Sequence, residues 1–480
     1  MKLAFSICSL ISVVLFSFLT STVFLKVFAL TCIIILSRYI LSPLLSLSIF
    51  NPINLDTFIF SVGFIVRPLL LCSQGDFYRA DWGYNYNDFI EAIQSSLNLS
   101  ILGLLSYYIG CYFSQLSFFS GRSVIKILSK SFRIESYRIF LITLSLLGFI
   151  GYFVYLLSSH SASVLGILSL IISPHRSGTY IYRSISFLVI YGFIFSLLMK
   201  HNAKDSFFRR INTILVVPSF IISLSFHDRK WFFLLLLLLL FWLSFVNSPE
   251  KNVQKKVSSR FAPVVKCFGI IISLSALLII LNNLRDFAYG LVAGSSLTGE
   301  VLSNEYFVNQ FKQILLSGMF SFFDYQSRVI DSSASFFDSG IQLSFNYFLS
   351  SFIPSGLLED KALPLNQIVA ASWPLGTSAT SPAISMFGES YIILGVAGVF
   401  IFPAIYAFIS SSLYLQATSK YLTPWIKIQY TAFDMNFVLV VRTGFLASLS
   451  AFLITFITLL FALFLSNIFY YRSALNSLLR

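Results

Sequence analysis

The chain has 480 residues, of which 57% are hydrophobic, 17% are aromatic and only 11% are charged. Soluble domains carry about 25% charged residues, and the mean hydropathy of +0.84 leaves too few polar side chains to cover a soluble surface. Composition therefore excludes a soluble enzyme, a DNA-binding protein and a secreted disulfide scaffold, and the net charge of +13 must be explained by where the charges lie.

Long apolar runs predict about twelve membrane-spanning helices, because a helix needs about 20 mostly apolar residues to cross the hydrocarbon core. The eleventh run is the weakest, since Lys427 and Asp434 lie inside it, and a tight hairpin near residues 20–22 separates the first two. We expect an all-α polytopic integral membrane protein whose single membrane domain takes in the whole chain, 1–480. In chain order the runs are 4–21, 23–41, 55–72, 92–117, 139–158, 183–199, 212–226, 231–247, 267–284, 387–414, 425–441 and 446–470.

Basic residues predict the orientation of these helices. They concentrate in the connecting segments 118–138, 200–211 and 248–266, and Lys and Arg normally gather in cytoplasmic loops. The three segments alternate correctly with a cytoplasmic N-terminus, and an even number of spans places the C-terminus there too. The positive charge is thus explained by membrane orientation and anionic lipid rather than by nucleic acid.

One large segment, residues 285–386, separates the ninth and tenth spans and is predicted to be an exterior loop. It is rich in Ser, Phe, Gly and Asp, and its acids outnumber its bases. The chain contains no G-x-x-x-x-G-K-[ST] phosphate loop, which argues against ATP-driven transport by this chain alone.

The cysteines and histidines predict no metal centre. No two of the cysteines have the spacing of a zinc or redox motif, and there are only four histidines. We interpret the cysteines as small core residues: Cys8, Cys32, Cys72, Cys111 and Cys267.

Ionisable groups at membrane depth are costly, so each is a candidate for function. Arg67, in GFIVRPLLL near the outer end of the third span, either binds substrate or snorkels to the interface. Snorkelling is favoured for Arg38, near the inner end of the second span. Arg442, in VVRTGF, lies in the predicted exterior turn before the last span, where an ordinary helix-end charge is the alternative.

Five further cations lie at or just outside predicted exterior helix ends, where positive charge is normally depleted. Arginine binds phosphate oxygens through a planar fork, so this group suits a lipid pyrophosphate. Ion pairing, for example with Asp228 or Asp286, is the alternative for each member. The five are Arg176, Arg183, Arg229, Lys230 and Arg285.

Two groups are candidates for proton transfer. His227 is the best of the exterior histidines, because Asp228 and Arg229 adjoin it. Glu389 lies in SMFGESY, where the large loop enters the tenth span. A carboxylate there either acts as a general base or holds an arginine in place, and the second role is favoured because intramembrane acids usually pair.

The whole pattern resembles the bacterial oligosaccharide repeat-unit polymerases, the Wzy-type O-antigen and capsular polysaccharide polymerases. The resemblance rests on the number of spans, the large exterior loop and three local features. These are the turn with Arg229, the run SPAISMFGESYIILGVAG over residues 381–398, and Arg442-Thr443-Gly444 before the final helix. The pattern of Arg, ten residues and Gly that is described for such exterior loops has no instance here with that spacing.

The resemblance implies a GT-C-like glycosyltransferase in the bacterial inner membrane. Such enzymes transfer a growing glycan from undecaprenyl pyrophosphate to the non-reducing end of a newly flipped repeat unit and need no nucleotide sugar and no ATP. We expect no metal and no other cofactor. On this basis Arg176, Arg229 and Arg285 would bind the diphosphate, and Glu389 would be the base or an arginine-positioning group. Further candidates for substrate contact are Arg67, Arg183, His227, Lys230, Arg328, Tyr391 and Arg442.

The partners implied by the resemblance are a flippase and a chain-length regulator. Two alternative functions remain at this point. An O-antigen ligase-type glycosyltransferase shares the lipid donor and the large loop, whereas a lipid-linked oligosaccharide flippase would have short loops and two similar halves.

Overall fold

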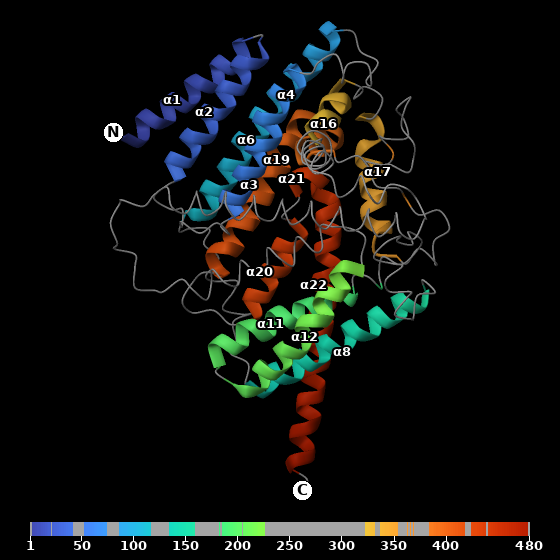
Figure 1. The fold of residues 1–480 in the computed structure, drawn as a ribbon. Coiled ribbons are helices and arrows are strands. Elements are labelled where there is room, and N and C mark those ends of the chain that lie inside the picture. The colour runs from blue at the N-terminus through green and yellow to red at the C-terminus, as the bar shows by residue number, and fades with distance from the viewer. Residues whose placement is uncertain are drawn as a thin grey trace, which may run out of the picture. The chain divides into compact units, whose positions relative to one another are not determined.

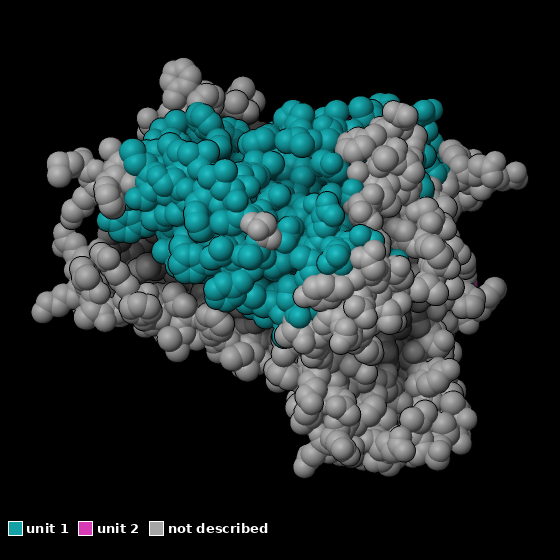
Figure 2. All heavy atoms as spheres, turned by 90° about the horizontal axis from the view of Figure 1, so that it is seen from above, with its two compact units in different colours: residues 1–122, 312–416, 436–451 teal, residues 123–311, 417–435, 452–480 magenta. Residues whose placement is uncertain are grey.

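The computed structural model is predominantly helical, and no strand occurs in the residues that it describes. They form two compact units, which we treat separately. Unit 1 comprises Met1–Arg122, Lys312–Gln416 and Asn436–Ala451 (teal in Figure 2). Unit 2 comprises Ser123–Phe311, Ala417–Met435 and Phe452–Arg480. The described residues are 2–20, 22–41, 52–73, 86–116, 134–158, 182, 185–203, 205–225, 322–331, 337–353, 362, 365, 368, 384–417, 424–437 and 440–478.

The helices are labelled in Figure 1, and most of them lie in a single one of the two units. Those of unit 1 are α1 (Lys2–Leu19), α2 (Val23–Leu41), α3 (Pro52–Ser61), the π-helical turn η1 (Val62–Val66), α4 (Arg67–Ser73), α6 (Tyr86–Gln115), α16 (Phe322–Asp331), α17 (Phe337–Ser350), α19 (Met386–Ala417) and α21 (Val440–Thr443). Those of unit 2 are α8 (Ile134–Ser158), α11 (Leu188–Ala203) and α12 (Ser206–Ser225). Helices α20 (Pro424–Phe437) and α22 (Phe445–Leu478) contribute residues to both units.

Five of the described helices are long and apolar enough to cross a membrane, so the chain is a multi-pass α-helical membrane protein. They contain the segments Val23–Leu41, Asn87–Gln115, Ser136–Leu157, Met386–Leu415 and Ser448–Ile468. Shorter apolar helical segments occupy the first, third and sixth predicted spans: Ser6–Leu19, Ile59–Cys72 and Leu188–Met199. The predicted spans 231–247 and 267–284 lie outside the described residues.

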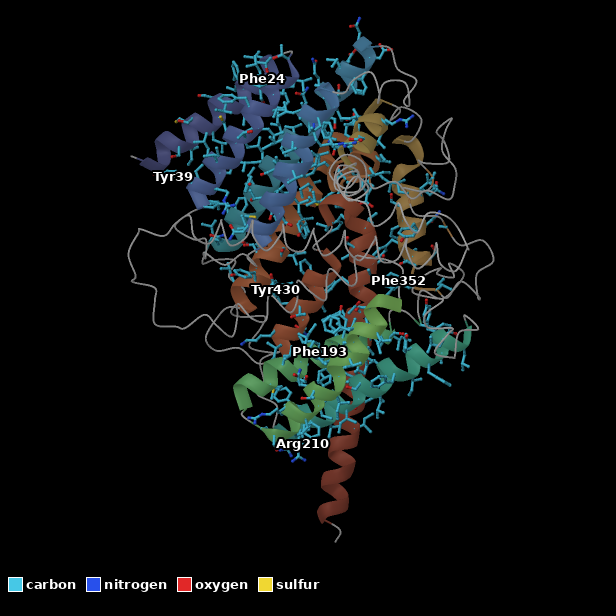
Figure 3. The ribbon with its side chains drawn as sticks, in the orientation of Figure 1. Phe24, Tyr39, Phe193, Arg210, Phe352 and Tyr430 are labelled. Carbon is cyan, nitrogen blue, oxygen red and sulfur yellow. The ribbon has the colours of Figure 1, made fainter. Side chains whose placement is uncertain are left out.

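The first two helices form the predicted hairpin. Helix α1 ends at Leu19, α2 begins at Val23, and the two pack along each other (Figure 1). Lys26 lies in the first turn of α2 and is only 3% exposed. Its Nζ donates to the carbonyl O of Ser17 at 3.0 Å and to Oδ1 of Asn98 on α6 at 2.6 Å. The exposed rings of Phe24 and Tyr39 lie near the two ends of α2 (Figure 3).

The third predicted span contains a wide turn. Between α3 and α4 the turn η1 is π-helical, and the N–H of Arg67 donates to the carbonyl of Val62, five residues back. Pro68 follows directly. Proline has no N–H, and its ring clashes with the carbonyl four residues earlier in a regular α-helix. The extra residue in the π turn relieves that clash and leaves Arg67 at the start of α4.

Glycines let the long helices α6 and α19 approach closely. A Cβ on Gly110 would collide with the carbonyl of Ala404, and one on Gly103 would collide with the ring of Phe387. The hydroxyl of Ser106 donates to the carbonyl of Phe400 between them. Small residues are the usual means of close helix contact in a membrane, so this face of α6 lies directly against α19.

Helix α19 contains a break that the sequence did not predict. Leu394 (φ −137°, ψ 18°) and Gly395 (φ 61°, ψ −146°) have non-helical backbone angles. The angles of Gly395 are essentially restricted to glycine. The break brings the carbonyl of Ser390 against Gly398, where a Cβ would not fit. Glycine is therefore required at two positions for different reasons: at Gly395 for the backbone angles, and at Gly398 for the close approach of the Ser390 carbonyl.

Unit 2 is built around α11, nearly all of whose described side chains are buried. Figure 3 shows Phe193 of α11 among the helices of the unit, whereas Arg210 of α12 points outward. Asp205 caps α12, because its Oδ1 accepts the N–H of Phe207 at 3.0 Å. Its Oδ2 accepts two bonds from Arg138 of α8, from Nε at 3.0 Å and from Nη2 at 2.6 Å. These hydrogen bonds hold the pKa of Asp205 below its ordinary value.

Candidate functional site

One end of unit 1 gathers charged and polar side chains from three segments, and backbone N–H groups from a fourth, that are far apart in the sequence. The segments are the start of α4, the helix α16, the first turn of α19 and the start of α22. We call this group the Arg67–Glu389 cluster and define it as Arg67, Asp324, Gln326, Ser385 and Glu389. It contains two of the residues that the sequence singled out, Arg67 and Glu389.

Arg67 forms a buried ion pair with Asp324. Its Nε donates to Oδ1 at 2.8 Å, and its Nη2 donates to Oδ2. This two-bond geometry is the strongest that a guanidinium and a carboxylate form. Arg67 is only 1% exposed and is buried within the protein, which argues against the alternative in which it snorkels to the interface. Burial raises the pKa of Asp324, and the hydrogen bond from Arg67 opposes that shift.

The ion pair brings part of the predicted exterior loop into the helical core. Helix α16, which carries Asp324, packs against α6 and η1. Val329 of α16 shares a hydrophobic cluster with Ile384 and Ile392 at the start of α19. A Cβ on Gly340 of α17 would collide with the carbonyl of Ile392. The described helices of segment 285–386 are therefore packed against the spans.

Gln326 connects α16 to two other helices. Its Nε2 donates to the hydroxyl of Ser96 at 2.9 Å and to that of Ser100 at 3.0 Å, both on α6. Its Oε1 accepts the hydroxyl of Ser385. The same hydroxyl oxygen accepts the N–H of Gly388 at 3.0 Å and so caps α19. Every polar atom of the Gln326 side chain group is thus used in fixing α16.

Glu389 connects the cluster to the start of α22. Its Oε2 accepts the backbone N–H groups of Phe445 and of Leu446, the latter at 3.2 Å. Between α21 and α22 the backbone turns at Gly444, whose φ is +94°. Glu389 is 7% exposed. In the described residues its partners are backbone N–H groups, rather than the arginine that was favoured from sequence.

A layer of buried aromatic rings adjoins the cluster. Phe387 stacks on Phe64 with ring centroids 5.1 Å apart and on Phe60 at 5.5 Å. Phe60 in turn meets Tyr107 edge-on at 5.1 Å. These rings fill the space between α3, η1, α6 and α19 in unit 1.

A second polar group lies beyond the aromatic layer. Asp56 of α3 is 1% exposed, and its Oδ2 accepts the hydroxyl of Tyr107 at 2.7 Å and that of Tyr406 at 3.0 Å. We call these three residues the Asp56 cluster. Asp56 and Arg67 are eleven residues apart on one continuous helical run, a rise of about 16 Å at 1.5 Å per residue. The two clusters therefore lie at different depths along this helical run.

Of the remaining predicted site residues, some lie on described helices and the others lie outside the described residues. Arg328 lies half-buried on α16 and Tyr391 half-buried on α19, both on helices of the Arg67–Glu389 cluster. Arg442 lies on α21, two residues before Gly444. The other candidates lie outside the described residues: Arg176, Arg183, His227, Arg229, Lys230 and Arg285.

Sequence reasoning missed Asp324, Gln326 and Asp56. Asp56 carried a usable signal, because it is an acid inside a predicted span. Asp324 and Gln326 lie in the loop segment and carried none, since their partners are on other helices. Among the described residues, no group of three or more His, Cys, Asp or Glu side chains is arranged to hold a metal ion.

No family model matches the chain, and comparison with curated proteins and with solved structures found no match either.

Proposed function

We propose that this membrane protein polymerises undecaprenyl-pyrophosphate-linked oligosaccharide repeat units into O-antigen or capsular polysaccharide. The reaction takes place at the outer face of the bacterial inner membrane. The proposal includes about twelve spans, both termini in the cytoplasm and a GT-C-like architecture. It rests on the sequence resemblance and on the distribution of polar groups in unit 1.

The observation that carries the proposal is the position of the Arg67–Glu389 cluster. Buried charged and polar groups gather at the end of unit 1 that the basic loops predict to be exterior. In the described part of unit 1, the rings of Phe60, Phe64 and Phe387 separate this cluster from Asp56. Buried polar groups that an apolar ring layer interrupts favour an enzyme that works at one membrane face over a flippase, which needs a continuous polar path across the bilayer.

The proposed reaction needs a cation and a proton acceptor. A hydroxyl oxygen of the acceptor sugar attacks the anomeric carbon of the donor glycan, and the bond from that carbon to the pyrophosphate oxygen breaks. Undecaprenyl pyrophosphate leaves with the bonding electron pair, and the hydroxyl proton passes to a base. Arg176, Arg229 and Arg285 would stabilise the charge that develops on the leaving group. Glu389 is the candidate for accepting the proton or for positioning the site.

The test is a gel of the surface glycan from a strain lacking the gene, run beside its lipid-linked intermediates. Surface glycan that carries a single repeat unit, with no ladder, is the expected result. Long polymer that stays on the lipid carrier would instead identify an O-antigen ligase. Repeat units trapped on the cytoplasmic face would identify a flippase, and either result would overturn the proposal.

The residue roles are tested by complementing that strain with alanine variants of Arg176, Arg229, Arg285 and Glu389. Each variant is compared at equal abundance in the membrane, with the exposed Glu91→Gln as control. We expect shortened or absent ladders from all four alanine variants. Full-length polymer from all of them would remove these residues from the reaction.

A further inference from the structure

The carboxyl group of Glu389 accepts hydrogen bonds from the protein backbone. Its Oε2 accepts the N–H groups of the first two residues of α22, Phe445 and Leu446. The first N–H groups of a helix have no partner within the helix, and an acceptor placed there stabilises the helix start. Glu389 therefore caps α22 from another helix, 56 residues earlier in the chain.

The capped turn is shaped to admit this carboxyl group and little else. A Cβ on Gly444 would lie 2.6 Å from Oε2 and 2.7 Å from Cδ of Glu389. The φ of +94° at Gly444 is itself a conformation that favours glycine. Two independent features, the backbone angle and the close approach, thus require glycine opposite Glu389.

The turn fixes the short helix that precedes it. The N–H of Gly444 donates to the carbonyl of Val440 at 3.0 Å, which closes α21. Val440 and Val441 are buried, and α21 packs against α3. On the other side, the hydroxyl of Ser448 donates to the carbonyl of Gly444 at 2.9 Å, and the ring of Phe445 lies 5.5 Å from that of Phe402 on α19. The turn is held on both sides, with Glu389 at its centre.

We infer that Glu389 is a positioning residue: its carboxyl group caps α22 and holds the turn that carries Arg442 and Thr443, and it does not accept the substrate's proton. The inference rests on the proposed function for the reaction in which the turn takes part. A general base needs a lone pair within hydrogen-bond reach of the substrate hydroxyl. In Glu389, Oε2 accepts two backbone bonds at the turn, and Oε1 also faces the turn, since a Cβ on Gly444 would lie 2.9 Å from it.

Four variants separate the two roles. Glu389→Gln keeps an acceptor oxygen but removes the proton acceptor, whereas Glu389→Ala removes both. Gly444→Ala keeps the carboxyl group and expels it from the turn. Gly192→Ala is the matched glycine control, because a Cβ there meets Ser145 Oγ at 3.1 Å and the Cδ1 atoms of Leu141 and Leu215 at 3.6 Å, with no backbone clash and no positive φ. The exposed Glu91→Gln is the control for the amide substitution.

The first measurement is hydrogen–deuterium exchange over residues 440–450 in the full-length protein in lipid nanodiscs. We expect the amides of Phe445 and Leu446 to exchange about 2- to 30-fold faster in Glu389→Ala and Gly444→Ala, the range that corresponds to loss of one helix cap. Glu389→Gln and the controls should keep them protected. Unchanged protection in Glu389→Ala would show that Glu389 does not cap α22, and this result does not depend on the proposed function.

The second measurement is glycan ladder length in the complemented strain at matched membrane abundance. We expect at least a tenfold loss of polymer in Glu389→Ala and Gly444→Ala, and less than a threefold loss in Glu389→Gln. If Glu389→Gln loses polymer as fully as Glu389→Ala while its amides stay protected, Glu389 is a proton acceptor and the inference is wrong. If the gene deletion leaves the ladder intact, the proposed function fails, and the exchange data still decide the cap.

Discussion

Arg67 and Asp324 are separated by 257 residues in the sequence, yet they form a buried two-bond ion pair. Taking two charges out of water costs several kcal/mol for each ion, which their attraction offsets only when the geometry is good. Such a pair adds little net stability over a well-packed apolar pair, but losing one partner is costly. The ion pair therefore specifies where α16 docks more than it stabilises the fold.

Asp324→Ala should destabilise the protein by about 3–5 kcal/mol, because it removes the ionic partner of a buried guanidinium. Replacing both residues, as Arg67→Met with Asp324→Leu, should recover most of that loss. Thermal melting of detergent-solubilised protein measures the effect, with the exposed Glu91→Ala as control. A double variant that is no more stable than Asp324→Ala would argue against a charge effect.

Asp205 makes the stability of unit 2 dependent on pH. Its pKa in the folded protein is depressed, chiefly by the hydrogen bond from Arg138. Its contribution is therefore fully present above the unfolded pKa of about 3.9, and it is lost as pH falls through the folded value.

Asp205→Asn should lower the melting temperature at pH 7. The difference from wild type should shrink as the pH falls below about 4, because the aspartate of the wild type then becomes protonated. Melting curves at a series of pH values measure this. A difference that persists unchanged to low pH would show that the charge of Asp205 is not its cause, since the protonated aspartate and the asparagine are then both neutral and both still accept the N–H of Phe207.

At the scale of single elements, the break in α19 is the clearest departure from a regular spanning helix. Gly395 has backbone angles that an L-residue with a side chain rarely adopts. Non-helical backbone at membrane depth is tolerated only where protein or water satisfies it. By its position, the break divides α19 into a first segment that carries Glu389 and a second segment that carries Tyr406.

Gly395→Ala should cost about 1–3 kcal/mol, the range for a strained backbone conformation, or should straighten α19. Hydrogen exchange of the amides from 394 to 399 distinguishes the two results. Straightening would protect them, and strain would expose them further. Melting and exchange identical to wild type would show that the break is not needed. Gly192→Ala again provides the control.

Periodicity and composition predicted most of the elements but not their interruptions. The hairpin of α1 and α2 follows from the short polar step near residues 20–22, and α6, α8, α19 and α22 follow from runs too apolar for water. The break at Gly395 could not be read from the sequence, because glycine is common inside membrane helices, and Pro403 in the same helix marks no break.

The candidate site was predictable only in part, for a related reason. Arg67 and Glu389 stood out because a charge in an apolar run is costly. Their partners did not, since Asp324 lies in a long polar segment, and the partners of Glu389 are backbone N–H groups that no side-chain pattern reveals. Local sequence patterns locate charged groups that are costly to bury, whereas long-range packing decides which partners form hydrogen bonds or ion pairs with them.

At the scale of the whole molecule, orientation follows from the basic loops and is open to a direct test. Asp88, at the start of α6, lies in a predicted exterior segment, and Arg210, on α12, lies in a predicted cytoplasmic one; both are exposed. In a cysteine-free background, an impermeant maleimide should label Asp88→Cys in intact spheroplasts. Arg210→Cys should react only after permeabilisation. The reverse pattern would invert the topology and move the Arg67–Glu389 cluster to the cytoplasmic face.

The burial of Lys26 has a consequence for how the protein is made. Its partner Asn98 lies 72 residues later in the chain, which at 5–20 residues per second corresponds to about 4–14 s of synthesis. During that interval Lys26 has only one of its two partners in the folded protein, the carbonyl of Ser17. The ammonium group then has to stay near the headgroups, and the hairpin can settle to its final depth only when the nascent chain delivers α6. We therefore expect the hairpin of α1 and α2 to insert first and to be fixed in place only when Asn98 of α6 reaches the buried amine.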